Sequence, residues 1–231
     1  MQQFFIDTIE NAQLSKAQIR QCKTVLRMNK DDMIRIVDKN GKGYLARFEN
    51  DNLDQLILVE PLVFPKKKAK VTLIMSLIRA EALELTIQKA TELAVDHIIF
   101  YQAEHGVVRD YGKKTERKLE RFATIAKEAA EQSHQQFMPQ IGPIISLDEI
   151  GNHLAELNLI ADVRQDCYAD KLVKEAEDIA VIIGPEGGFS DHEREQLAKK
   201  GFQSLSLSPF VLRAETAAIT ALAQLQLVLG V

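Results

Sequence analysis

Two stretches near the carboxyl end carry most of the information in this chain: residues 179–190, IAVIIGPEGGFS, and residues 205–217, LSLSPFVLRAETA. Each begins as a short apolar run, breaks at a proline and leads into a helical pattern. Residues 181–183 are β-branched and do not alternate with polar residues, which is typical of a strand buried on both faces of a parallel sheet.

The end of the first stretch predicts a tight loop followed by a helix. Ser190 with Glu193 three residues later forms a capping box, which favours a helix start at Ser190. Such a loop lies at the carboxyl end of a strand, where open α/β sheets bind ligands. A sharp turn with glycines at positive φ is the alternative interpretation. The residues that interrupt regular structure are Gly184, Pro185, Gly187 and Gly188.

A phosphate-binding loop is disfavoured at this place. The Glu186 carboxylate would repel a phosphate, and the lysine that a P-loop requires is missing. In the second stretch, Arg213 and Glu215 precede an almost uncharged helical pattern over residues 216–229. Charged side chains at the entrance to a buried helix are costly unless they are paired or functional. The two residues are therefore either catalytic or a structural ion pair.

Residues 1–64 alternate short apolar runs with turns, which predicts a small β-barrel with one helix. Residues 61–70, PLVFPKKKAK, have no periodicity and predict a linker. We therefore expect two domains, 1–68 and 69–231. Strands are expected at residues 3–6, 33–37, 44–48 and 56–59, the helix at 15–26, and a hairpin turn at 38–41.

From residue 71 onward apolar strands alternate with helical patterns, which predicts an α/β domain with a mainly parallel sheet. Expected strands cover residues 71–78, 97–101, 159–163 and 181–183, and expected helices cover 79–95, 113–136, 147–157, 171–176 and 214–231. The last helix has almost no polar face, so it must be covered on all sides, and a homodimer interface would supply the cover.

The net charge of −4 is distributed unevenly. Residues 1–70 carry a net charge of +4 and the remainder carries −8. The basic part could follow a phosphate backbone, and a solvated surface is the alternative. No signal peptide, membrane span or metal-ligand spacing is evident, and the two distant cysteines, Cys22 and Cys167, are typical of reduced thiols. We therefore expect a cytoplasmic protein without a metal.

GPEGGFS followed by VLRAETA resembles the small-subunit ribosomal RNA methyltransferase E family, which methylates uridine N3 and belongs to the SPOUT superfamily. The resemblance extends to RAEALELTIQKATELAV at 79–95, AAEQS at 129–133 and VLRM at 25–28. It implies a SPOUT-type α/β domain with a carboxyl-terminal trefoil knot, preceded by a PUA-like RNA-binding barrel. It also implies S-adenosylmethionine (SAM) as cofactor, small-subunit (16S) ribosomal RNA as substrate, and a homodimer.

The resemblance also suggests site residues. Arg213 would stabilise charge that develops on the uridine ring, and Glu215 would act as a base or orient Arg213. Arg27, Arg79, Gln132 and Ser133 would contact RNA. Residues expected to bind the cofactor are Leu159, Ile183, Gly184, Pro185, Glu186, Gly187, Gly188, Leu207, Ser208, Leu212 and Thr216.

The chain departs from the family pattern at several places. His134 and Gln135 stand where Gly-Arg is usual, Ser208 and Phe210 replace the Gly and Arg of a Leu-Gly-Pro-Arg loop, and His105 replaces an Arg. Ala94 also replaces a usual Gly. Each missing Arg removes an expected contact with RNA or a carboxylate. A catalytically inactive RNA-binding protein is therefore the main alternative, and a nucleotide-binding enzyme of another class is a third.

Overall fold

The computed structural model of this chain describes residues 1–162, 169, 173 and 175–229. Cys167 and three of the six residues of the helix expected at 171–176 lie outside the described residues, and the other three, 173, 175 and 176, are not helical. The contacts within the chain divide it into two compact units. The first comprises Met1–Pro65 with Ala130–Phe137, and the second comprises Lys66–Ala129 with Met138–Val231.

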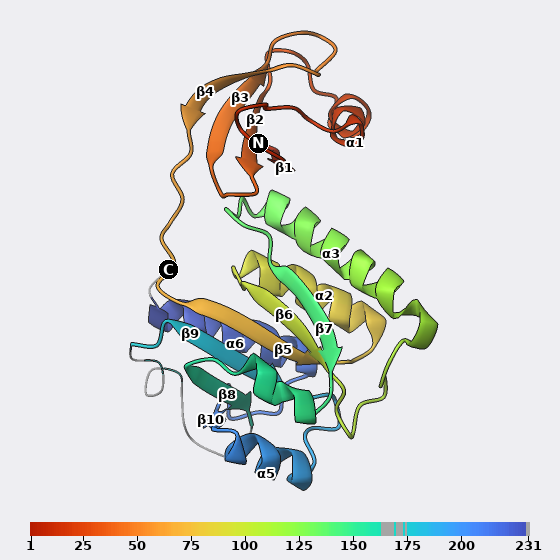
Figure 1. The fold of residues 1–231 in the computed structure, drawn as a ribbon, viewed down its shortest axis with the longest axis vertical. Helices are drawn as coiled ribbons and strands as arrows, with labels where there is room; N and C mark the ends of the chain where they lie inside the picture. The colour runs from red at the N-terminus through yellow and green to blue at the C-terminus, as the bar shows by residue number, and fades with distance from the viewer. Residues whose placement is uncertain (163–168, 170–172, 174, 230–231) are drawn as a thin grey trace. The chain divides into compact units, whose positions relative to one another are not determined.

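A four-stranded sheet forms the first unit (Figure 1). Its order is β1-β2-β3-β4, with β1 parallel to β2 and the other pairs antiparallel. Phe4, Ile34, Ile36 and Phe48 pack in its core. The four strands that the sequence predicted are present with slightly different bounds: β1 Gln3–Ile6, β2 Met33–Asp38, β3 Gly43–Phe48 and β4 Leu56–Pro61.

The one helix expected in this unit changes its winding. It begins at the predicted cap, Ser15, where Ser15 and Gln18 form a capping box, and continues as α1, Lys16–Arg20. A π-helical turn, Gln21–Val25, follows, and Arg27 then adopts a left-handed φ of 53°. Left-handed backbone is costly for a residue with a Cβ, by roughly 1–2 kcal/mol. The periodicity of the sequence does not distinguish a π turn from an α turn.

Residues 130–137 join the first unit from a distant part of the chain. The Gln3 side-chain amide donates to the Gln135 carbonyl oxygen (2.7 Å), and the Phe5 amide donates to the Glu131 carboxylate (3.2 Å). The Gln136 amide donates to the Gly41 carbonyl oxygen (3.0 Å). These hydrogen bonds attach the end of the long helix to the first sheet, while the functional division at residue 68 stays a prediction.

The second unit is built on a six-stranded sheet in which every described strand pair is parallel. This confirms the α/β class with a mainly parallel sheet. The strand order is β10-β8-β9-β5-β6-β7 (Figure 1). The strands are β5 Lys70–Ser76, β6 His97–Tyr101, β7 Gln140–Ile145, β8 Leu157–Ala161, β9 Asp178–Ile183 and β10 Gln203–Leu205.

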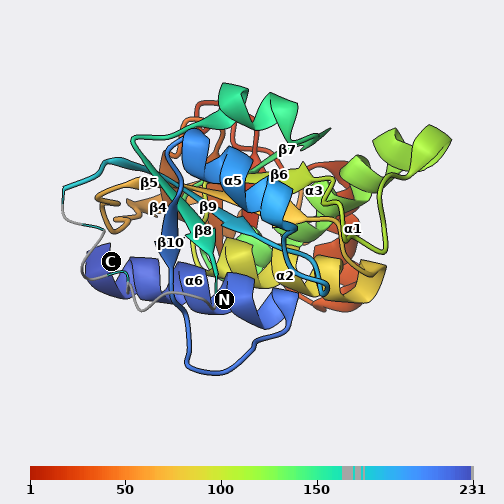
Figure 2. The same ribbon diagram turned by 90° about the horizontal axis from the view of Figure 1, so that it is seen from below.

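Helices cover both faces of this sheet. Figure 2 shows α2 (Ala80–Glu92) and α6 (Ala214–Leu229) on one side and α5 (Asp191–Lys199) on the other. Because side chains alternate along a strand, Leu73 packs in the core with the helices α2, α3 (Thr115–Gln132) and α6, while Ile74 packs with α5. The core is thus two apolar layers separated by the sheet.

Two elements differ from the expectation. β7 was not predicted, because Gly142 and Pro143 interrupt its apolar pattern; proline is tolerated there because β7 is an edge strand. The helix expected at 147–157 is a short 3₁₀ segment, Asp148–His153. None of the helices in the described part of the chain has the length and apolar character required to cross a membrane.

Candidate cofactor site

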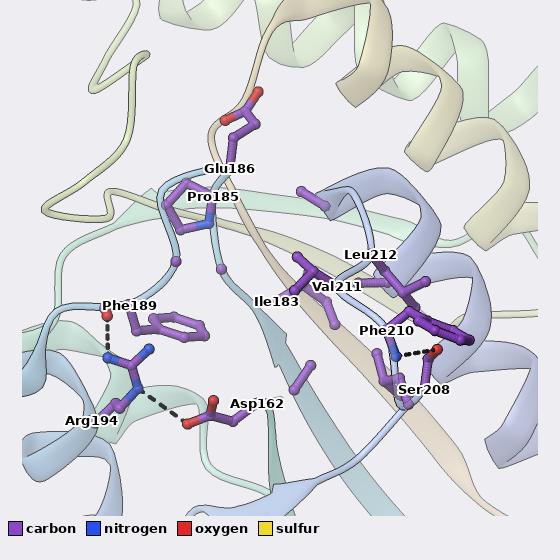
Figure 3. A pocket seen from close by; sticks show the side chains of 16 residues that line it. Asp162, Ile183, Pro185, Glu186, Phe189, Arg194, Ser208, Phe210, Val211 and Leu212 are labelled. Carbon is purple, nitrogen blue, oxygen red and sulfur yellow. Dashed lines mark hydrogen bonds and ion pairs between the residues drawn. The ribbon is translucent and has the colours of Figure 1, made fainter. Parts of the chain in front are cut away.

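A cavity lies at the carboxyl ends of β8 and β9 and beside the loop that follows β10 (Figure 3). Three segments that are distant in sequence meet here because their strands are neighbours in the sheet. This is the place where open α/β sheets bind ligands. The lining residues are Ala161, Asp162, Ile183, Gly184, Pro185, Glu186, Gly188, Phe189, Arg194, Leu207, Ser208, Phe210, Val211, Leu212, Ala214 and Ala217.

The glycines of the first loop have different physical roles. Gly188 alone among them adopts a positive φ, of 70°. At Gly184, a Cβ would lie 3.0 Å from the ring of buried Phe189. At Gly187, a Cβ would lie 3.0 Å from the His105 Cβ and 3.2 Å from its carbonyl oxygen. Positive φ therefore explains one glycine, and close packing explains the other two.

The predicted capping box at the start of α5 is present. The Glu193 amide donates to the Ser190 hydroxyl (3.0 Å), and the Ser190 amide donates to the Glu193 carboxylate (2.7 Å). The Glu193 side chain is fully buried, and it also accepts the Tyr101 hydroxyl (2.5 Å) and the Glu104 amide (3.0 Å). One carboxylate thus connects the loop after β6 to the loop after β9.

The pKa shifts around this carboxylate follow from burial and hydrogen bonding. Burial, together with the hydrogen bond to Glu193, raises the pKa of the Tyr101 hydroxyl well above its usual range. Hydrogen bonds from the Ser190 and His192 side chains lower the pKa of the exposed Glu104 carboxyl. Tyr101 therefore remains a hydrogen-bond donor over the whole physiological pH range.

The second loop is held at one end and exposed at its tip. The Gln224 amide of α6 donates to the Leu207 carbonyl oxygen (3.0 Å), and the Phe210 amide donates to the Ser208 hydroxyl (3.1 Å). Phe210 and Val211, which were not among the predicted site residues, are 76% and 86% exposed. Two exposed apolar side chains at the rim of a cavity are suited to contact a ligand or a partner.

Most of the predicted cofactor residues line the cavity, and three do not. Leu159 is fully buried in the middle of β8. Gly187 faces His105, and Thr216 is exposed on the first turn of α6. Those that line it are Ile183, Gly184, Pro185, Glu186, Gly188, Leu207, Ser208 and Leu212.

Arg213 and Glu215 lie beside the cavity and are absent from its lining. Arg213 is exposed, and its neighbours Leu212 and Ala214 both line the cavity. Neither charged side chain makes a hydrogen bond or an ion pair with any residue that the structure describes. The structural ion pair that was the alternative interpretation is therefore not formed in this structure.

The four residues expected to contact RNA lie outside the cavity lining. Arg27 is exposed after the π turn of the first unit. Gln132 is the last residue of α3 and Ser133 follows it, both in the same unit. Arg79 is exposed immediately before α2 in the second unit. Their RNA contacts stay a prediction.

Sequence reasoning missed the ion pair in the cavity wall. Arg194 Nε lies 3.1 Å from a carboxylate oxygen of Asp162, and the two side chains are 22% and 9% exposed. Arg194 also donates through Nη1 to the Phe189 carbonyl oxygen, as Figure 3 shows. Asp162 directly follows β8. A polar residue at the carboxyl end of a strand is a candidate ligand-binding residue, and this position could have identified Asp162 from the sequence.

Comparison with known proteins places this architecture in a family. The family model described as an RNA methyltransferase domain matches residues 65–226. A ribosomal RNA small subunit methyltransferase E from Rickettsia conorii is 32% identical, with 94% of this chain and 91% of the relative covered. One from Bacillus subtilis is 28% identical, with 96% of this chain and 94% of the relative covered.

This chain belongs to the ribosomal RNA small subunit methyltransferase E family. A methyltransferase E from Neisseria gonorrhoeae bound to S-adenosyl methionine is similar in structure, with a TM-score of 0.88 and 26% identity over 98% of this chain and 97% of that one. A structure from Legionella pneumophila with bound SAM has a TM-score of 0.87 and 29% identity over 97% and 96% of the two chains.

The cavity of this methyltransferase E family member has the chemical character that a nucleoside with a sulfonium requires. Its wall combines apolar side chains with the backbone of two loops, which can contact an adenosine at close range. The side chains in its wall that carry ionisable groups are Asp162, Glu186 and Arg194, two carboxyls and one guanidinium. No cluster of metal-ligating side chains occurs among the residues that the structure describes.

Proposed function

We propose that this chain is a SAM-dependent methyltransferase that acts on N3 of a uridine in 16S ribosomal RNA. The cavity is the observation that carries the proposal, because it is formed by the GPEGG loop and by the loop that leads into Arg213. Two proteins of similar structure hold SAM. Bound in this cavity, SAM would supply an electrophilic methyl group on sulfur.

Methyl transfer to uridine N3 requires positioning and charge stabilisation. The N3–H proton must leave, the N3 lone pair forms a bond to the methyl carbon, and the carbon–sulfur bond breaks to give S-adenosylhomocysteine. The negative charge that develops on the uracil oxygens during deprotonation would face Arg213 at the edge of the cavity. Glu215, on the first turn of α6, would accept the N3 proton, because it makes no hydrogen bond or ion pair with Arg213 in this structure through which it could orient the guanidinium.

The finer architecture is part of the same proposal. We infer that the chain end forms a trefoil knot, since the loop after β9 and the loop after β10 return to one cavity before α6 begins. The first sheet would be a PUA-like barrel that binds RNA through Arg27. The protein would work as a cytoplasmic homodimer that uses α6 as its interface, since Leu227 of α6 is 81% exposed.

Calorimetry with SAM and a transfer assay with labelled SAM test this function. We expect binding of SAM and labelling of a single uridine in 16S ribosomal RNA, located by mass spectrometry of nuclease fragments. ATP serves as the control ligand and should not bind. Binding of SAM without methyl transfer to either free RNA or small ribosomal subunits would favour the inactive RNA-binding alternative.

A further inference from the structure

Arg194 is the one cation among the described residues that line the cavity, and its guanidinium is fixed from two sides. Nε pairs with Asp162 at the end of β8. Nη1 donates to the Phe189 carbonyl oxygen at the end of the Gly-rich loop, residues 184–189, which contains the GPEGG motif. Nη1 also lies 3.5 Å from Asp191, in the first turn of the same helix. A planar fork held in this way has a set orientation.

The remaining nitrogen, Nη2, makes no hydrogen bond with any described residue. It lies 3.8 Å from the position that a Cβ on Gly188 would occupy, beside the open backbone of the Gly-rich loop. Figure 3 shows Nε and Nη1 engaged, with no interaction drawn to Nη2. Two N–H donors of a preorganised, largely buried cation are thus available to an acceptor in the cavity.

The chemistry of the cofactor identifies a suitable acceptor. SAM has a single anionic group, the α-carboxylate of its methionyl part, together with a cationic ammonium and a cationic sulfonium. A guanidinium binds a carboxylate through short, charge-assisted hydrogen bonds. The neighbouring Asp162 carboxylate, 9% exposed, would attract the ammonium group on the same α-carbon.

We propose that Arg194 and Asp162 bind the amino-acid end of SAM, with Arg194 Nη2 donating to the α-carboxylate. This proposal rests on the proposed function, since it needs SAM as the ligand of this cavity. It assigns opposite parts of the ligand to different walls. The loops contact the adenosine, and the Arg194–Asp162 pair binds the amino-acid end. The pair therefore gives ligands that carry the α-amino acid a higher affinity than ligands that lack it.

Two ligands that differ only in the amino-acid end test the proposal. S-adenosylhomocysteine carries the α-amino acid, and 5′-methylthioadenosine retains the adenosine and the thioether without it. By calorimetry, Arg194→Met should bind S-adenosylhomocysteine about ten- to a hundredfold more weakly, the range for a hydrogen bond to a charged group. Its affinity for 5′-methylthioadenosine should change by less than about twofold, since that ligand has no carboxylate to lose.

Lys199→Met provides the matched control, because it removes a positive charge from an exposed position on the same helix. It should change neither affinity. Arg194→Gln retains an N–H donor to Asp162 and serves if the Met variant does not fold. It should show the same ligand-dependent loss.

Equal loss of affinity for both ligands would overturn the proposal, since Arg194 would then act only by holding the cavity walls together. Unchanged affinity for S-adenosylhomocysteine would overturn it as well. If the unaltered protein binds neither ligand, the cofactor assignment itself fails and this proposal fails with it. The proposed function survives in the first two cases, so the two failures are distinguishable.

Discussion

Arg213 stands between the second loop of the cavity and α6, exposed and without a described side-chain partner. A cation in this place gains a partner only when a ligand or a developing charge faces it. Such a group acts on the transition state more than on ground-state binding. Its contribution should therefore be visible in turnover and not in the affinity for SAM.

Arg213→Ala should bind SAM with nearly normal affinity and methylate RNA about a hundred- to a thousandfold more slowly, the usual effect of removing one charge-stabilising donor. Single-turnover rates and calorimetry measure the two quantities separately. Arg213→Lys should recover only part of the rate, because lysine lacks the planar fork. Normal turnover of the Ala variant would contradict the catalytic assignment, and loss of folding would indicate a structural role.

Glu193 contributes to the stability of the fold through its hydrogen-bond partners. Its buried carboxylate accepts hydrogen bonds from Tyr101, Glu104 and Ser190, all of them donors. In Glu193→Gln an NH₂ group replaces one carboxylate oxygen. This group cannot accept a hydrogen bond, so one of the three donors would lose its acceptor. We expect the free energy of unfolding to fall by about 1–3 kcal/mol, the cost of a buried unsatisfied group.

Urea denaturation of Glu193→Gln measures this loss. Glu195→Gln is the control, because it makes the same change at an exposed position of the same helix, where no side-chain partner is described. It should alter stability by less than about 0.5 kcal/mol. Equal midpoints for the two variants would show that the buried hydrogen bonds contribute nothing to stability.

At the scale of elements, the Gly-rich loop is shaped by the segment behind it. His105, in the loop after β6, occupies the space where a side chain at Gly187 would extend. Gly187 therefore does not touch the cavity and still affects its shape. The same two loops are also connected by Glu193, so the cavity wall depends on a neighbour two strands away in the sheet.

Gly187→Ala should displace the loop, because the contacts with the His105 Cβ and carbonyl oxygen would be 3.0 and 3.2 Å. Overpacking of this kind costs typically about 1–3 kcal/mol, so the affinity for SAM should fall by roughly tenfold. Calorimetry provides the measurement. Gly151→Ala, where the nearest atom is a flexible Lys200 Nζ at 3.6 Å, should leave the affinity unchanged.

At the scale of the whole molecule, α6 has an apolar surface that the described chain covers only in part. Leu222 and Leu225 are buried against the sheet and its helices, whereas Leu227 is 81% exposed. The α6 sequence is therefore apolar on two sides of the helix: one side packs in the core, and the other is left uncovered. Substitution of Leu225 would damage the core itself. Substitution of Leu227 leaves the core intact, so it can test the proposed dimer interface without disturbing the fold.

Leu227→Asp should convert the proposed dimer into a folded monomer, because a charge placed in an apolar interface must be desolvated. Sedimentation at micromolar concentration measures the state of assembly, and circular dichroism confirms the fold. Val63→Asp, at a site 93% exposed in the first unit, should remain dimeric. An unaltered protein that sediments as a monomer would contradict the proposed dimer.

The sequence by itself determined the class of the second unit and the place of its cavity. Both follow from local rules: β-branched runs form buried strands, prolines and glycines end them, and Ser190 with Glu193 caps the next helix. The same rules placed the strands of the first sheet. They failed for β7, whose glycine and proline imitate a loop, and for the π turn after Arg20.

Only the tertiary structure decided which distant groups meet. Tyr101 and Glu193 are 92 residues apart, Asp162 and Arg194 are 32 apart, and Gln3 and Gln135 are 132 apart. Each contact depends on the order of strands in a sheet or on the return of a helix end, and no local periodicity encodes either. Buried charges and amides also look like surface residues in a sequence, because their cost is compensated only by partners that folding brings together.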